Sequence, residues 1–292
     1  MDRNRERATA LLRRAVRLHD GDPVDPPPWL ARCVEGDAPS YPGCRVLSLR
    51  QRLGVQGGKP DLLRAHALAD TACVGEDRIA CADVALDLVD GVGVVRDVSR
   101  GIALLDADCW RGVGAACRGL GEALSRGAGG PAKDERIRDA FKGACNLKDA
   151  TACARYGTFH VTGMFGLPSN LDLARLLHDD ACKLGSGEGC YLAAGPLSTR
   201  SVAAHTRACA LGWPTACHEL GLATRDGRDG AVEDKGRALE LLADACDGGL
   251  ANACIDGRAL ATTAPIDAKR RHATASQFQF RLCALDPRQP GC

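Results

Sequence analysis

The chain has 292 residues, with 38 Lys and Arg against 37 Asp and Glu. This balance leaves no net field that would attract nucleic acid or an anionic membrane, so we expect neither as a partner. Aromatic residues make up only 4% of a chain that is 45% hydrophobic, which favours closely packed helices over a β-sandwich. No apolar run approaches the roughly 18 residues of a membrane span, so we expect an all-α protein without a transmembrane segment.

Residues 1–20 are predicted to form an N-terminal amphipathic capping helix, because their apolar positions follow helical spacing. An Arg-rich targeting peptide is the alternative, and Asp2 and Glu6 count against it. The segment has no apolar stretch of the kind that an intact secretory signal contains. Residues 21–28 include three successive prolines, which forbid a continuous helix and predict a stiff connector.

Cysteine spacing dominates the rest of the chain. The sixteen cysteines fall into eight close pairs, in chain order Cys33, Cys44, Cys73, Cys81, Cys109, Cys117, Cys145, Cys153, Cys182, Cys190, Cys209, Cys217, Cys246, Cys254, Cys283 and Cys292. Six consecutive pairs are 8 residues apart, the first pair is 11 apart and the last 9 apart. The pairs recur every 36 to 37 residues, which is typical of a stacked array. We therefore predict about seven αα repeats over 29–292, with a shortened unit at 190–209.

A turn is expected inside each regular pair. Residues eight apart in one helix are separated by about 12 Å, whereas a disulfide needs Cα atoms about 4.4–6.8 Å apart. If the first cysteine ends one helix and the second begins the next, the two can meet. Glycine stands three places after the first cysteine in four pairs, where a left-handed residue can close a helix, at Gly112, Gly185, Gly212 and Gly249.

The longer gaps between pairs are predicted to hold two helices and a loop, as the apolar spacing of 153–182 indicates. The gap from Cys190 to Cys209 has lost about nine residues relative to the others, so we expect one of its helices to be cut to a turn or two. Small residues recur four places after the second cysteine, where a helix is expected to press against its neighbour, at Ala85, Gly121, Gly157, Ala194 and Gly221.

Disulfides are our interpretation of the six regular pairs, given their even number and spacing. Structural zinc usually takes ligands in C-x₂₋₄-C pairs, which are absent, so we expect no metal site and no cofactor. Reduced core cysteines remain the alternative if the compartment is reducing. Disulfides favour a periplasmic or extracellular protein whose signal has been removed, with the cytoplasm as the alternative. The bonds of Cys33, Cys44, Cys283 and Cys292 stay open.

The pattern resembles the Sel-one-like repeat family, relatives of tetratricopeptide repeats, and within it the Helicobacter cysteine-rich branch. The likeness covers about 28–292 and rests on the Ala-Cys pairs, on Tyr156-Gly157 and Leu220-Gly221, on the Gly91-Val92-Gly93-Val94 loop with Asp97, and on Arg237-Ala238. It implies a right-handed superhelix of αα units with one disulfide per repeat, used mainly as a scaffold for proteins or peptides. Some members of that branch are said to bind or hydrolyse β-lactams, so a weak β-lactamase or penicillin-binding hydrolase is the alternative function.

No complete catalytic motif accompanies the repeats. S-x-x-K, G-x-S-x-G, H-E-x-x-H and G-x-x-x-x-G-K-[ST] are all missing, and the seven histidines are scattered. Tyr156, Phe159 and His160 lie on a helix of the type that lines the concave side of helical solenoids, although at least one of them is expected in the core. We therefore predict no catalytic residues, and a monomeric scaffold that binds a protein, peptide or cell-wall fragment in its concave groove.

Overall fold

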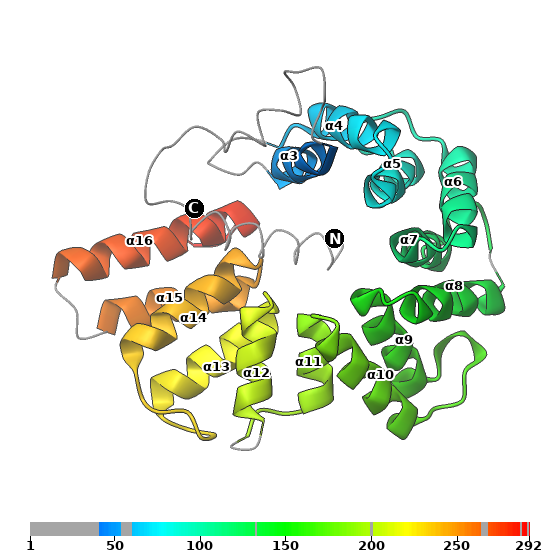
Figure 1. Cartoon of the computed structure of the whole chain (residues 1–292). Coiled ribbons are helices and arrows are strands. Elements are labelled where there is room, and N and C mark those ends of the chain that lie inside the picture. The colour runs from blue at the N-terminus through cyan, green and yellow to red at the C-terminus, as the bar shows by residue number, and fades with distance from the viewer. Residues whose placement is uncertain are drawn as a thin grey trace. The chain divides into compact units, whose positions relative to one another are not determined.

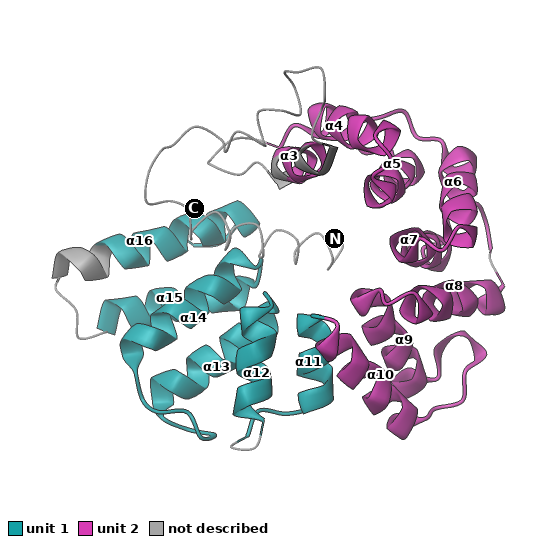
Figure 2. Cartoon of the chain, viewed as in Figure 1, with its two compact units in different colours: residues 1–19, 185–292 teal, residues 20–184 magenta. Residues whose placement is uncertain are grey.

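The computed structural model describes residues 41–53, 60–131, 133–198, 201–263, 268–286, 288–290 and 292. These residues fall into two compact units, one within Asp20–Leu184 and the other within Gly185–Cys292 (Figure 2). The predicted helix 1–20, the connector 21–28 and Cys33 lie outside the described residues. The predicted division into an array that starts at residue 29 therefore stays a prediction.

The described residues form helices without a single strand, so the all-α prediction is confirmed (Figure 1). The unit before residue 185 contains α3 (Tyr41–Leu53), α4 (Leu62–Val74), α5 (Arg78–Asp90), α6 (Val98–Trp110), α7 (Gly114–Ser125), α8 (Asp134–Asn146), α9 (Ala150–Thr162), the short η2 (Met164–Gly166) and α10 (Leu171–Lys183). The other unit contains α11 (Gly187–Ala194), α12 (Val202–Ala210), α13 (Pro214–Asp226), α14 (Lys235–Asp247), α15 (Ala251–Thr263) and α16 (Ala268–Leu285).

Two kinds of helix alternate along the chain. The even-numbered helices α4 to α16 each carry the first cysteine of a pair near their C-terminus, and we call them A helices. The odd-numbered helices α3 to α15 each carry a second cysteine near their N-terminus, and we call them B helices. Within each unit an A helix packs on the B helices next to it in the chain, and α5 also packs on α7. This arrangement is an αα-repeat solenoid.

The turn inside each cysteine pair has a constant geometry. At Gly112, Gly185, Gly212 and Gly249 φ is +84°, +91°, +81° and +95°, so the predicted left-handed glycines are confirmed. In the second repeat the Gly112 amide donates to the Cys109 carbonyl, and the next amide, of Val113, donates to the Asp108 carbonyl. This pairing satisfies carbonyls at the end of the A helix. The following residue then starts the B helix with no further loop.

The disulfides join the two ends that this turn brings together. Five regular pairs are bonded, with Cα atoms 4.5 to 4.7 Å apart: Cys73–Cys81, Cys109–Cys117, Cys145–Cys153, Cys209–Cys217 and Cys246–Cys254. Cys44, Cys182 and Cys190 are also disulfide-bonded. One disulfide per repeat, as the resemblance implies, is therefore present in the structure.

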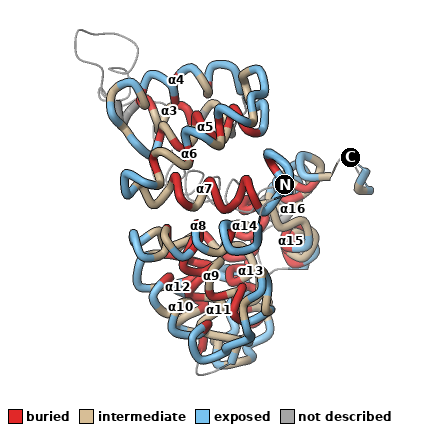
Figure 3. Tube along the Cα trace, turned by 90° about the vertical axis from the view of Figure 1, so that its right-hand side faces the viewer, coloured by how far each residue is buried: buried red, intermediate tan, exposed pale blue. Residues whose placement is uncertain are grey.

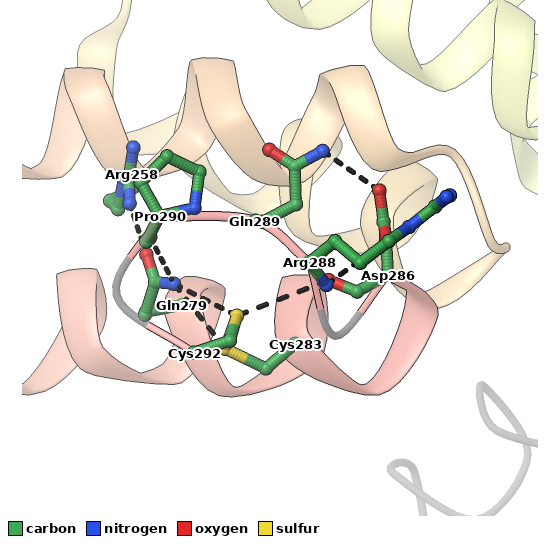
Figure 4. The surroundings of a disulfide bond; sticks show 8 residues. All are labelled: Arg258, Gln279, Cys283, Asp286, Arg288, Gln289, Pro290 and Cys292. Atoms are coloured by element: carbon green, nitrogen blue, oxygen red, sulfur yellow. Dashed lines mark hydrogen bonds and ion pairs between the residues drawn. A yellow bond between two sulfur atoms is a disulfide. The ribbon is translucent and has the colours of Figure 1, made fainter.

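The last pair is bonded too: Cys283–Cys292 holds the C-terminal residues against α16 (Figure 4). Its Cα atoms are 5.4 Å apart across a separation of 9 residues. Gln279, one turn earlier on α16, donates from Nε2 to the Pro290 carbonyl at 3.0 Å, and its Oε1 accepts a hydrogen bond from Arg258 of α15. The last helix pair and the chain end are thus tied to one another at one point.

Small residues allow the helices to approach closely. A Cβ added at Gly121 would lie 2.7 Å from the Phe141 ring, and one at Gly157 would lie 2.6 Å from Cδ2 of His178. Ala85 is buried at the equivalent position of α5. Figure 3 shows α7 buried along most of its length, since α5, α6 and α8 all pack on it. The packing role predicted for small residues is therefore confirmed at Gly121, Gly157 and Ala85.

The short repeat differs from our expectation. The other A helices up to α14 begin 11 residues before their cysteine, whereas α12 begins at Val202, 7 residues before Cys209. α11 also ends early, at Ala194, and has 8 residues where most B helices have 13. The prediction that a single helix would absorb the deletion is wrong, because each of the two helices loses about one turn. The helix ends that carry the cysteines stay intact, since the disulfide turn constrains them.

None of the helices in the described part of the chain combines the length and the apolar character needed to cross a membrane.

Candidate binding surface

The unit after residue 184 carries a polar and aromatic cluster on its B helices. Tyr191 of α11 donates its hydroxyl hydrogen to Oε1 of Glu219 of α13 at 2.8 Å. Burial, followed by this bond to a carboxylate, raises the pKa of Tyr191 to about 12. The tyrosine ring also lies edge-on to His205 and is tilted against Trp213, with centroids 5.4 and 6.2 Å apart. Tyr191 is therefore a neutral, fixed hydrogen-bond donor.

His205 of α12 contacts both Tyr191 and Glu219 and is fully buried. Its Nδ1 donates to the backbone carbonyl of Ser201 at 3.0 Å, because a carbonyl can only accept, and its Nε2 lies 3.3 Å from Oε2 of Glu219. Ser201, His205 and Glu219 are the residue types of a hydrolytic triad. The Ser201 hydroxyl, however, lies 2.9 Å from the Pro196 carbonyl and donates to it. The group orders the start of α12 and is not arranged as a nucleophile with its base.

The cluster continues from α13 to α15. His218, next to Glu219 in the chain, lies 2.6 Å from Oδ2 of Asp256 through its Nε2. The pKa of Arg225 is raised mainly by its hydrogen bond to Asp226. The negative charge of Asp256 makes a smaller contribution in the same direction. Two contacts thus join successive B helices, one between α11 and α13 and one between α13 and α15. We call Tyr191, His218, Glu219 and Asp256 the B-face cluster.

The B helices α3 and α5 of the other unit are joined by a group of charges. Arg52 of α3 forms a two-pronged ion pair with Asp87 of α5, and His66 of α4 lies 2.9 Å from the same carboxylate through its Nδ1. Asp87 is 1% exposed. The equivalent positions of α7 and α9 carry the apolar residues Ala123 and Phe159, so Asp87 places a charge where the other repeats have core. The burial of this carboxylate therefore depends on both partners.

A second group of charges lies between α5 and α9. Arg118 of α7 donates to Glu122 and to the α9 cap residue Asp149, at 3.2 and 3.1 Å. Burial opposes the charge of Arg118, but these two carboxylates outweigh it and raise the pKa. Burial also raises the pKa of Asp83, although Arg52, Arg45 and Arg118 act in the opposite direction. These ion pairs join successive repeats and are satisfied within the unit.

The three residues predicted for a groove lie at the end of α9 with different exposure. Phe159 is buried in the core, where its ring lies edge-on to Phe141 at 5.0 Å. His160 is 5% exposed, and neither ring nitrogen has a hydrogen-bond partner among the described residues. Tyr156 is half-buried and lies edge-on to His160. At most Tyr156 presents a surface large enough for a ligand, so the groove assignment of the three stays a prediction.

The B-face cluster was not predicted from the sequence, although the cysteine spacing contains a signal for it. Its members stand one or two places after a second cysteine, at Tyr191, His218, Glu219 and Asp256. Arg45, Asp83 and Arg118 occupy the same places in the other unit. Polar side chains therefore recur at these two places in both units, although Ala82 and Ala154 also occur there.

Among the described residues, no group of three or more His, Cys, Asp or Glu side chains could hold a metal ion.

Comparisons with known proteins place the fold. No protein-family model and no curated protein match the chain. A crystal structure of a Sel1 repeat protein from Oxalobacter formigenes is similar, with a TM-score of 0.59, 18% identity, and coverage of 84% of this chain and 72% of that one. A protective antigen of uropathogenic Escherichia coli with an SLR fold is also similar, with a TM-score of 0.55 and 15% identity over 86% of this chain.

The chain spans 64% of the length of that Escherichia coli antigen. At these identities the similarity concerns the fold, and it agrees with the repeat length, the paired helices and the disulfide turns described above. The Helicobacter branch of the resemblance is not confirmed. The chain has the Sel1-repeat fold.

Proposed function

We propose that the protein is a disulfide-stapled repeat scaffold that binds a segment of another protein on the B-face cluster. The observation that supports the proposal most directly is the continuity of Tyr191, Glu219, His218 and Asp256 across three B helices. Tyrosine is enriched at protein interfaces, and the hydroxyl of Tyr191 is held in place here by Glu219. Tyr191, the aromatic member of the cluster, lies on the shortened helix α11.

The disulfides support an oxidising compartment, so the proposed site of action is the periplasm or the extracellular space. No feature of the described residues favours the β-lactam hydrolase that the resemblance suggested. The hydrolase stays a prediction, and turnover of a chromogenic cephalosporin would establish it.

The test is affinity capture with a matched pair of variants. The protein with His218→Ala and Asp256→Ala loses the contact between these two side chains of the B-face cluster. The protein with Asp180→Ala and Lys183→Ala loses a polar pair, 3.0 Å long, from the exposed side of an A helix. We expect partners captured from native extract, identified by mass spectrometry, to be lost with the first variant only. Equal capture by the two variants would contradict the proposal.

A further inference from the structure

The last disulfide, Cys283–Cys292, differs from the internal ones in its exposure. Cys283 is half-buried on α16, whereas Cys292 is exposed and belongs to no helix. In four internal bonds the second cysteine is buried near the start of a B helix, at Cys117, Cys153, Cys217 and Cys254. Attack on the first cysteine of those pairs would expel a thiolate at a buried site, which burial disfavours. A thiolate in solution can approach Cys292 directly.

An amide donor lies against this exposed bond (Figure 4). Oε1 of Gln279 accepts from the guanidinium of Arg258, which can only donate, so the amide is oriented with its Nε2 toward the disulfide. Nε2 lies 3.3 Å from Sγ of Cys283 and 3.4 Å from Sγ of Cys292, and it also donates to the Pro290 carbonyl at 3.0 Å. The positive charge of Arg258 on the amide oxygen strengthens the donor at the other end of the amide.

This donor acts more strongly on a thiolate than on the intact bond. The sulfur of a disulfide is a weak acceptor, whereas an ionised sulfur receives a charge-assisted hydrogen bond. A thiolate formed at Cys283 stays within reach of Gln279, because the two residues lie one turn apart on α16. Gln279 therefore stabilises Cys283 as the leaving group when the bond is opened.

The charges drawn around the bond in Figure 4 are compatible with an approaching anion. Asp286 is the one carboxylate among those eight residues, and it accepts hydrogen bonds from Arg288 and Gln289 at 3.0 to 3.2 Å. Arg258 adds a positive charge beside Gln279. The nearest described charges therefore attract a thiolate more than they repel it.

We infer that Cys283–Cys292 is an exchangeable disulfide, through which the protein forms a mixed disulfide with an external thiol. The partner's thiolate attacks Sγ of Cys292 and a new bond joins the two. The Cys283–Cys292 bond breaks, and its electron pair leaves on Cys283 as a thiolate. One disulfide and one thiolate are present before and after the step, so it consumes no oxidant or reductant.

The exchange is reversible, because the thiolate of Cys283 can attack Cys292 again and release the partner. While the mixed disulfide lasts, α16 is no longer cross-linked to Cys292. The partner is a cysteine thiol, carried either by another protein or by a small molecule. The inference makes no use of the B-face cluster and stands or falls separately from the proposed function.

The test uses the whole protein with its disulfides formed. The probes are reduced glutathione, a small thiol, and acetyl-Ala-Cys-Ala-amide, which represents a protein cysteine. N-ethylmaleimide stops the reaction, and intact mass with peptide mapping locates both labels. We expect one probe on Cys292 and one N-ethylmaleimide on Cys283 before any internal pair reacts, and the faster probe identifies the source of the thiol.

Three outcomes would overturn the inference. One is the absence of an adduct at millimolar thiol. Another is a first adduct on Cys283, since the thiolate would then leave on Cys292. The third is earlier reaction at an internal pair, of which Cys73–Cys81 is the strictest comparison because both of its cysteines are half-buried.

Two glutamine variants test the leaving-group assignment. Gln279→Glu keeps an oxygen for Arg258 and replaces the amide donor by a carboxylate, and Gln277→Glu makes the same change at an exposed position of α16. We expect the rate of exchange to fall about tenfold or more with the first and to change little with the second. Equal rates in the two variants would refute the assignment.

A pH profile separates this role of Gln279 from a purely structural one. In Cys292→Ser, Cys283 is left as a thiol, and its rate of alkylation rises with pH as the thiolate forms. We expect this rise at higher pH when Gln279→Glu is added, and at an unchanged pH when Gln277→Glu is added. An unchanged profile with Gln279→Glu would show that Gln279 does not stabilise the leaving thiolate.

Discussion

The left-handed residue of each cysteine turn makes a sharp prediction possible. At Gly112 φ is +84°, and a Cβ there would meet nothing closer than Leu147 at 3.9 Å. Gly112→Ala therefore introduces no overlap and tests conformation alone. The left-handed state costs an L-residue about 1–2 kcal/mol. Reduced freedom of the unfolded chain returns about 0.4–1 kcal/mol. We expect a net loss of about 1 kcal/mol.

The matched control lies on the next A helix. Gly143 is helical in α8, and a Cβ there would meet no atom within 4 Å. Gly143→Ala should raise the free energy of unfolding by about 1 kcal/mol through helix propensity. The same substitution should therefore lower the free energy of unfolding at Gly112 and raise it at Gly143. The two variants should differ by about 2 kcal/mol.

The complementary change uses a turn that lacks glycine. Lys148 occupies the position of Gly112 in the next turn, with φ at +66°. Lys148→Gly should therefore raise stability by about 0.5–1 kcal/mol. The three variants are compared by urea unfolding under non-reducing conditions, with circular dichroism as the signal. The comparison holds if the dependence of the free energy of unfolding on urea concentration, the m-value, is the same for all of them. Stabilisation by Gly112→Ala equal to that of Gly143→Ala would refute the assignment of turn geometry.

Three further predictions concern packing, cross-links and pH. Gly101→Ala would place its Cβ 2.6 Å from the Ala85 carbonyl oxygen, and because backbone cannot move aside we expect a loss of about 1–3 kcal/mol in the same urea assay. Replacing Cys109 and Cys117 together by Ser opens a loop of about nine residues and should cost about 2.5 kcal/mol; an equal difference in the presence of reductant would contradict this. Burial lowers the pKa of His178, so the unfolded chain takes up its proton first and stability should be full above about pH 6.5 and fall below it. Thermal unfolding against pH checks this, and His178→Leu should flatten the acid limb.

The sequence by itself determined the repeat. Cysteines eight residues apart cannot bond within one helix, and the glycine three places after the first of them marks the left-handed residue of the turn. Small residues such as Gly157 predicted where neighbouring helices touch, since a Cβ there would overlap His178. These features are local or strictly periodic, and for that reason one sequence was enough to predict them.

Tertiary structure decided how the short repeat shares its deletion and which side chains meet. A gap of 19 residues between cysteines does not say whether α11, α12 or both are shortened. In the structure the cysteine-bearing end of each helix is complete, and each helix lacks about one turn at its other end. The B-face cluster depends on contacts across 28 to 38 residues, between Tyr191 and Glu219 and between His218 and Asp256. Such pairings follow from the stacking of repeats, and no local pattern specifies them.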